Sequence, residues 1–67
     1  MQWNEITNGE NSRTYVFADN QKQTFYDVVR VAVSASGTHR LETRQGGKFI
    51  VRNNWLSIEI VADKWSF

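Results

Sequence analysis

Apolar and polar residues alternate along most of the chain, and short turn signals interrupt this alternation at regular intervals. Each signal pairs residues that tolerate a positive φ or bond their own backbone. The intervals between them are too short for a helix of ordinary length. The turn signals are Asn8-Gly9, Asp19-Asn20, Ser36-Gly37, Gly46-Gly47 and Asn53-Asn54.

The segments between these signals predict strands, which we place at residues 2–6, 12–18, 24–35, 38–44, 48–52 and 55–62. The first segment contains Asn4 and Glu5 and can also be read as a loop. The third is too long to stay flat, and Asp27 falls among its inward positions, so we expect a bend or bulge near residues 26–28. We therefore expect an all-β antiparallel meander of five to six strands, forming a small SH3-like or partly open barrel.

Side-chain facing constrains the turns, because residues directly opposite each other in an antiparallel pair share a face. Placing Val31 opposite Leu41 requires a three-residue turn at residues 35–37, with Gly37 in the left-handed conformation. The same parity makes residues 45–47 a three-residue loop, with Gly47 in the equivalent place. A two-residue type I′ turn at Asn53-Asn54 would align two apolar pairs. These pairs are Val51 with Leu56 and Phe49 with Ile58.

These registers direct a basic and aromatic group of side chains to the outer face. We expect two cross-strand ion pairs, Arg30 with Glu42 and Lys48 with Glu59, and two facing pairs of like charge, Arg40 with Arg52 and Arg44 with Lys48. Trp55 would lie beside Arg52. Such a face either binds an anion and stacks a base, or is simply solvated. The candidate binding residues are Arg40, Arg44, Lys48, Arg52 and Trp55.

The remaining polar and aromatic residues have simpler expected roles. His39 should point inward near a hairpin end as a hydrogen-bonded rim residue, not a catalytic base. Asp27 should cap backbone amides at the bend. The expected core aromatics are Trp3, Tyr15, Phe17 and Tyr26. The C-terminal Trp65 and Phe67 should either fold back over the barrel or become buried in another chain.

Composition narrows the class of protein. Sixty-seven residues make one domain, 1–67, near the lower size limit for folding alone, and without cysteine no disulfide can stabilise it. One histidine makes a zinc site unexpected, and we expect no cofactor. Pairing of the edge strand, residues 56–61, with a second copy would compensate for the small core, aided by Trp65 and Phe67. The N-terminus lacks the features of a signal peptide and no apolar run spans a bilayer, so we expect a cytoplasmic protein.

Charge is unevenly spread. Residues 30–52 carry five of the eight Lys and Arg residues but one of the seven Asp and Glu residues. This excess of basic residues in the middle of the chain favours an anionic partner.

The segments SGTHRLET (36–43), GGKFIV (46–51) and WLSIEI (55–60) resemble short β-rich accessory proteins encoded by phages and prophages of Gram-positive bacteria. The resemblance covers the C-terminal half and supplies no catalytic residues. It implies a protein of the bacterial host cell's cytoplasm that binds a host component stoichiometrically.

Three functions follow from these features. The first is a non-catalytic binding protein that modulates or inhibits a partner protein, because Trp and Arg are enriched at interface hot spots. The alternatives are binding of a nucleotide or single-stranded nucleic acid on the same face, and a structural subunit of a larger assembly. An enzyme is not expected, since no set of nucleophile, base and orienting residue stands out.

Overall fold

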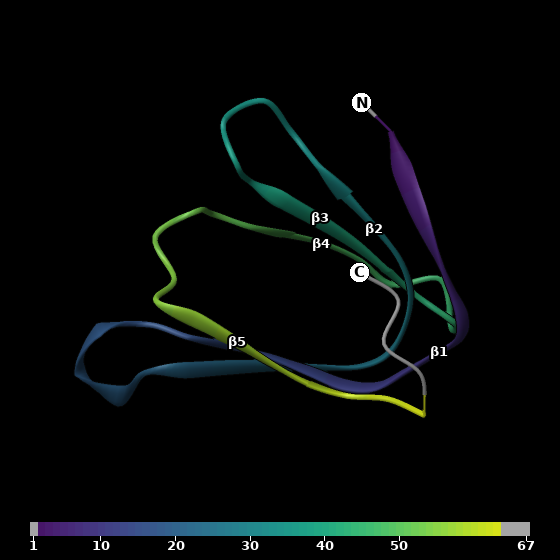
Figure 1. Ribbon diagram of the computed structural model, residues 1–67, viewed down its shortest axis with the longest axis horizontal. Helices are drawn as coiled ribbons and strands as arrows, with labels where there is room; N and C mark the ends of the chain where they lie inside the picture. The colour runs from purple at the N-terminus through teal and green to yellow at the C-terminus, as the bar shows by residue number, and fades with distance from the viewer. Residues whose placement is uncertain (1, 64–67) are drawn as a thin grey trace.

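Five antiparallel strands form one open and strongly bent sheet (Figure 1). The computed structural model describes residues 2–63, except for the side chain of Thr7. The strands are β1 (Trp3–Val16), β2 (Lys22–Val33), β3 (His39–Thr43), β4 (Lys48–Val51) and β5 (Ser57–Val61), and a short 3-10 turn, η1 (Ala18–Asn20), joins β1 to β2. Their order is β4-β3-β2-β1-β5, with β4 and β5 at the edges. The predicted all-β antiparallel fold is confirmed, and the sheet is not closed into a barrel.

β1 is continuous, although two strands were expected in its place. Both of its halves pair with β2, and the register shifts between Glu5 and Glu10. Asn8 and Gly9 have φ values of 66° and 73°. This turn signal does not reverse the chain but forms part of a large bulge, in which residues 6–9 stand opposite Val29 alone. Within the bulge, Ile6 is buried in the core. The expected strand at residues 2–6 is thus present, and it forms the first half of β1.

β2 bends where the sequence predicts a bulge. Asp27 has a φ of 55°, and the register with β3 shifts between Val28 and Arg30. The bulge interrupts the alternation of inward and outward side chains along β2. As a result Val28 and Val31 are both fully buried, while Val29 is half-buried. The bend allows one strand to serve both wings of the sheet.

Asp27 does not cap backbone amides with its carboxylate, contrary to expectation. Its carbonyl accepts a bond from the Arg44 backbone N–H at 2.9 Å, and its carboxylate accepts one from Gln45 Nε2 at 3.2 Å. The bulge turns Asp27 toward the β3–β4 loop, and the residue therefore fixes that loop against β2.

The β2–β3 hairpin has the predicted register. Val31 lies opposite Leu41, and Arg30 lies opposite Glu42. Gly37 has a φ of 88° and completes a three-residue turn. In this conformation a residue with a Cβ would be strained.

The β3–β4 hairpin differs from the prediction by two residues in register. Gly46, with a φ of 90°, takes the left-handed position, and Gly47 stands opposite Thr43 instead. A Cβ on Gly47 would lie 2.8 Å from Thr43 Oγ1. The two glycines are thus needed for different reasons, conformation at Gly46 and space at Gly47.

This shift changes the partners but not the faces of the two strands. Lys48 lies opposite Glu42, and Arg40 lies opposite Ile50. The predicted like-charge pairs, Arg40 with Arg52 and Arg44 with Lys48, are therefore wrong.

β5 does not form a hairpin with β4, which is the largest departure from the prediction. It pairs with β1, where Ile60 lies opposite Arg13 and Ile58 lies opposite Tyr15. Neither Asn53 nor Asn54 has a positive φ, so a type I′ turn is absent. Because β5 does not pair with β4, three expected cross-strand pairs are also wrong. These are Val51 with Leu56, Phe49 with Ile58, and Lys48 with Glu59.

Two hydrogen bonds explain this course of the chain. Asn53 Nδ2 donates to the carbonyl of Ser36 in the β2–β3 turn, and Leu56 N–H donates to the carbonyl of Val16 at 2.7 Å. The first bond holds the segment after β4 against the β2–β3 turn, and the second starts the pairing with β1.

The core lies between the two wings of the bent sheet. Of the expected core aromatics, Tyr15 is buried and Phe17 packs against the core, but Trp3 and Tyr26 are exposed. Trp65 and Phe67 lie outside the described residues. The buried apolar cluster comprises Ile6, Tyr15, Phe25, Val28, Val31, Leu41 and Val51.

Candidate functional site

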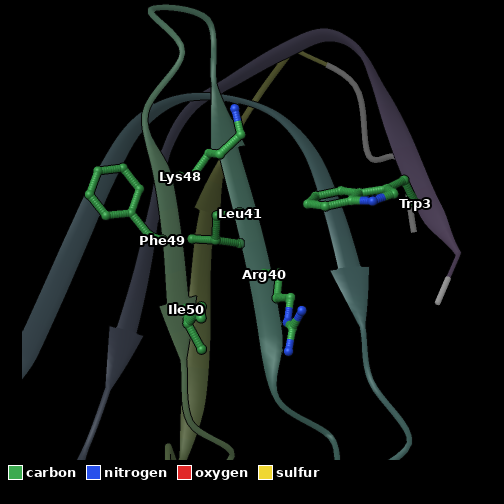
Figure 2. Close-up of a pocket in the computed structure, with 6 residues that line it drawn as sticks. All are labelled: Trp3, Arg40, Leu41, Lys48, Phe49 and Ile50. Carbon is green, nitrogen blue, oxygen red and sulfur yellow. The ribbon is translucent and has the colours of Figure 1, made fainter.

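The outer face of the sheet has a hollow of about 270 Å³ between β1, β3 and β4. Figure 2 shows the Trp3 indole lying across from Arg40 and Lys48, while the Phe49 ring points away on the other side of β4. The residues that line it, together called the Trp3 hollow below, are Trp3, Arg40, Leu41, Lys48, Phe49 and Ile50.

A small residue on β2 makes room for the hollow. Ala32 lies opposite Trp3 on one side and opposite Arg40 on the other, and Arg40 lies opposite Ile50. Residues opposite one another share a face, so these four side chains form one row across the outer face. Ala32 is fully buried between its longer neighbours. Its short side chain leaves space beside the indole.

The indole of Trp3 is held by a neighbouring cation. The Arg30 guanidinium carbon lies 4.9 Å from the Trp3 ring centroid, a cation–π contact. Arg30 Nη2 is 2.9 Å from a Glu42 carboxylate oxygen, and Nη1 is 3.7 Å from Glu5 Oε2. The charge of Arg30 is therefore balanced by two carboxylates on the same face. The cation–π contact orients the indole, while Arg30 remains paired with the two carboxylates.

The predicted binding residues do not form one site. Arg40 and Lys48 are exposed and line the Trp3 hollow. Arg44 instead donates from Nη2 to the Asn8 carbonyl at 3.2 Å, so it supports the bulge of β1. Arg52 is exposed just after β4. The hollow therefore gathers two of the four predicted cations.

Trp55 was expected on the outer face, but the structure places it against the core. Its ring centroid is 5.9 Å from that of Tyr15 and 5.2 Å from that of His39. The reason is the course of the chain after β4, which crosses to β1 and brings residue 55 over the interior. Trp3 provides the outward indole, and sequence reasoning had assigned it to the core.

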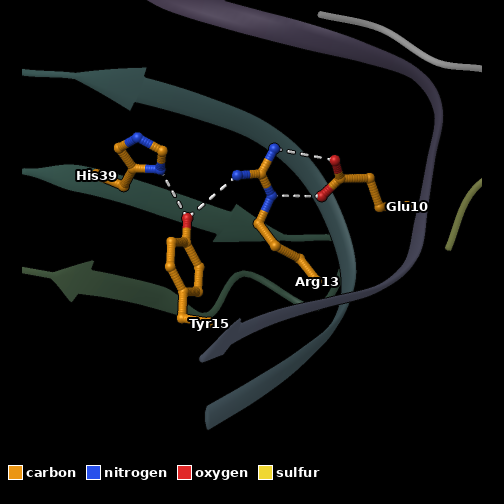
Figure 3. Close-up of polar contacts among 4 residues, drawn as sticks. All are labelled: Glu10, Arg13, Tyr15 and His39. Carbon is orange, nitrogen blue, oxygen red and sulfur yellow. Dashed lines mark hydrogen bonds and ion pairs between the residues drawn. The ribbon is translucent and has the colours of Figure 1, made fainter. Parts of the chain in front are cut away.

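A buried polar chain lies inside the fold (Figure 3). Arg13 donates from Nε and Nη2 to the two carboxylate oxygens of Glu10, at 2.8 and 3.0 Å. Its Nη1 donates to the Tyr15 hydroxyl at 3.1 Å, and that hydroxyl is 2.7 Å from His39 Nδ1. All four side chains are buried. His39 thus points inward as predicted, with Tyr15 as its partner.

Sequence reasoning missed Glu10 and Arg13. The signal was the strand alternation, because Arg13 shares the face of Tyr15 and Phe17 in the segment expected at residues 12–18. That alternation places Arg13 inward, although arginine is seldom fully buried unless paired.

The hydrogen bonds set the protonation of His39. The Tyr15 hydroxyl accepts from Arg13, so its own proton is available for His39 Nδ1, which accepts it as a neutral imidazole. Burial lowers the pKa of His39, and the positive charge of Arg13 lowers it further. Burial also raises the pKa of Tyr15, so its hydroxyl remains protonated.

We expect the protein to lose stability as pH falls below about 6.5, the usual pKa of histidine. Unfolded chains take up a proton on His39 at that pH, whereas the folded form does so only at lower pH, so acid favours unfolding. The slope from this one group is at most about 1.4 kcal/mol per pH unit. Urea unfolding between pH 5 and 8 measures it, and His39→Gln should flatten the profile near pH 6. An unchanged profile in that variant would exclude His39 as the cause.

Within residues 2–63 there is no group of three or more His, Cys, Asp or Glu side chains that could hold a metal ion. That part of the chain also lacks a helix long and apolar enough to cross a membrane. Comparison with known proteins finds no matching family model, no matching curated protein and no matching solved structure. The functional inference therefore depends on the site geometry and on the sequence.

Proposed function

We propose that this chain is a small non-catalytic binding protein that captures a partner protein on its outer face, at the Trp3 hollow. The observation that carries this proposal is an exposed, oriented indole beside a hollow lined by Arg40, Lys48 and Ile50. Tryptophan and arginine are enriched at interface hot spots, where an apolar pocket is surrounded by polar groups. In the Trp3 hollow, Trp3 and Ile50 supply the apolar surface, and Arg40 and Lys48 supply the polar groups around it.

The resemblance to phage and prophage accessory proteins supports a stoichiometric role for this binding. In this proposal the chain acts in the cytoplasm of a bacterial host and modulates or inhibits a host protein. A second copy paired through an edge strand is compatible with the role, because β4 and β5 both end the sheet.

A protein partner fits the face better than a nucleic acid. Glu5 and Glu42 lie on the same face and would repel phosphates, and Arg44 is engaged by the Asn8 carbonyl. Phosphate binding would also show a steep loss of affinity with salt. Nucleic-acid binding is therefore the alternative that the experiment below must test.

Trp3→Ala and Lys48→Glu should each remove partner capture while leaving the far-ultraviolet circular dichroism unchanged. Trp3→Ala deletes the indole and Lys48→Glu reverses a charge at the hollow, and neither residue is in the buried core. The measurement is affinity capture from a bacterial lysate, with every retained protein identified. Lys22→Glu, an exposed charge reversal at the start of β2, is the matched control and should retain the partner.

Two results would contradict this proposal. One is a partner captured equally by the wild type and by both hollow variants. The other is binding of a fluorescent single-stranded oligonucleotide that weakens steeply with salt and is lost in Lys48→Glu, which would identify the hollow as a nucleic-acid site.

A further inference from the structure

The strand that borders the Trp3 hollow is also an edge of the sheet. β4 pairs with β3, and the described residues provide no strand on its other side. Such an edge presents unpaired N–H and C=O groups that a further strand can use. The hollow and a free backbone edge therefore meet at β4.

The backbone groups of two hollow residues point to this free edge. Thr43 N–H bonds to Gly47 O at 2.9 Å, which makes this pair a hydrogen-bonded one. Hydrogen-bonded and non-bonded pairs alternate along an antiparallel ladder, so Phe49 directs its backbone groups toward β3. Lys48 and Ile50 then direct theirs away from β3, toward solvent. The side chains of Lys48 and Ile50 both line the hollow.

Both faces of β4 also expose apolar surface. Ile50 is 66% exposed on the outer face, and Phe49 is 41% exposed on the inner one. The Phe49 ring packs against Phe25 at a centroid distance of 4.9 Å, which holds it in place. A strand added to β4 would bury apolar area on both sides of the sheet. Recognition by strand addition combines such side-chain contacts with backbone hydrogen bonds.

Charge on the outer face indicates the chemistry of the added strand. Arg40 and Lys48 are exposed at the hollow, whereas the charge of Arg30 is already balanced by Glu5 and Glu42. An acidic side chain facing Lys48 would complement this charge, and an apolar side chain two positions away would lie beside Ile50. Alternate residues of one extended segment reach these two places.

We propose that β4 binds an extended segment of the partner protein as an additional strand, with an acidic and an apolar side chain at alternate positions beside Lys48 and Ile50, the two outer-face residues of β4 that border the Trp3 hollow. This inference rests on the proposed function and specifies how the partner is held. Backbone bonds to Lys48 and Ile50 supply affinity, and the hollow supplies specificity.

The test uses the synthetic peptide Thr-Val-Leu-Val-Glu-Ser, which places Leu opposite Ile50 and Glu opposite Lys48 in an antiparallel pairing. Its affinity for the wild-type protein is measured by isothermal titration calorimetry. Methylation of the backbone nitrogens of that Leu and Glu keeps both side chains but blocks strand pairing, and should weaken binding at least tenfold. Replacing Glu by Lys should also weaken binding, because the charge complement is lost.

A pair of protein variants tests the same edge from the other side. Ile50→Pro and Ile50→Ala both remove the isoleucine side chain, but only proline removes the edge N–H. That N–H faces away from β3, a position where edge strands tolerate proline. Ile50→Pro should bind the peptide at least tenfold more weakly than Ile50→Ala. If Ile50→Pro does not fold, the methylated peptide on wild-type protein still decides the question.

The outcomes separate this inference from the proposed function. Equal binding of the parent and methylated peptides, equal binding by the two Ile50 variants, or no binding of the parent peptide would each overturn strand addition. Capture of a protein from lysate that depends on Trp3 would still support the hollow as a binding site. Loss of that Trp3 dependence would remove the proposed function itself.

Discussion

Replacing Glu10 by alanine is expected to destabilise the protein by about 3–5 kcal/mol, because it removes the carboxylate that accepts two N–H groups of a fully buried arginine. A chain of 67 residues has a total free energy of unfolding of about 3–10 kcal/mol. The variant should therefore be largely unfolded or have a much lower urea midpoint. Chemical denaturation followed by tryptophan fluorescence measures the change.

Glu5→Ala is the matched control for this experiment. Glu5 is 74% exposed and lies 3.7 Å from Arg30, so its ion pair is worth less than about 1 kcal/mol. A double variant, Glu10→Leu with Arg13→Met, removes both charges and should recover much of the stability lost in Glu10→Ala. Equal midpoints for Glu10→Ala and Glu5→Ala would show that the buried ion pair does not stabilise the fold.

Replacing Tyr15 by alanine is expected to cost about 3–5 kcal/mol, the usual range for deleting a buried aromatic side chain. Tyr15 is fully buried, and its ring contacts Phe25, His39 and Trp55. The change also leaves buried polar groups of Arg13 and His39 without the hydroxyl that bridges them. Thermal and urea unfolding both measure this loss.

Tyr26→Ala makes the same substitution at a position that is 68% exposed on the neighbouring strand. It should change the free energy of unfolding by less than about 1 kcal/mol, in keeping with an exposed site. Tyr15→Phe separates the hydroxyl from the ring and should cost about 1–3 kcal/mol. A Tyr15→Ala variant as stable as Tyr26→Ala would contradict the placement of Tyr15 in the core.

Much of the strand pattern could be predicted from sequence because it depends on local signals. Alternation and a single left-handed glycine were enough to place Val31 opposite Leu41, and the misplaced Asp27 indicated the bulge of β2. Adjacent glycines were not enough at Gly46-Gly47, since either can adopt a positive φ. Gly47 N–H donates to Thr43 Oγ1, and a Cβ on Gly47 would lie too close to that oxygen; neither constraint is visible in the sequence.

The candidate site was harder to predict because it depends on which strands are neighbours. The Asn53-Asn54 signal marks a turn, but it does not show whether the next strand pairs with β4 or crosses to β1. The crossing takes Trp55 to the interior. Trp3 could not be placed outward without knowing that it lies opposite Ala32. Two of the predicted residues, Arg40 and Lys48, still lie at the hollow because β3 and β4 kept their expected faces.

The pairing of β5 with β1 has a consequence for the order in which the chain folds. It joins Ser12 to Val61, residues separated by most of the sequence, and such distant contacts form slowly because a long loop must close first. β1 to β4 pair with their sequence neighbours and can therefore assemble before β5 reaches β1. Until then one side of β1 lies open to pairing with other unfolded chains, a known route to aggregation. Docking of the five-residue β5 removes that hazard.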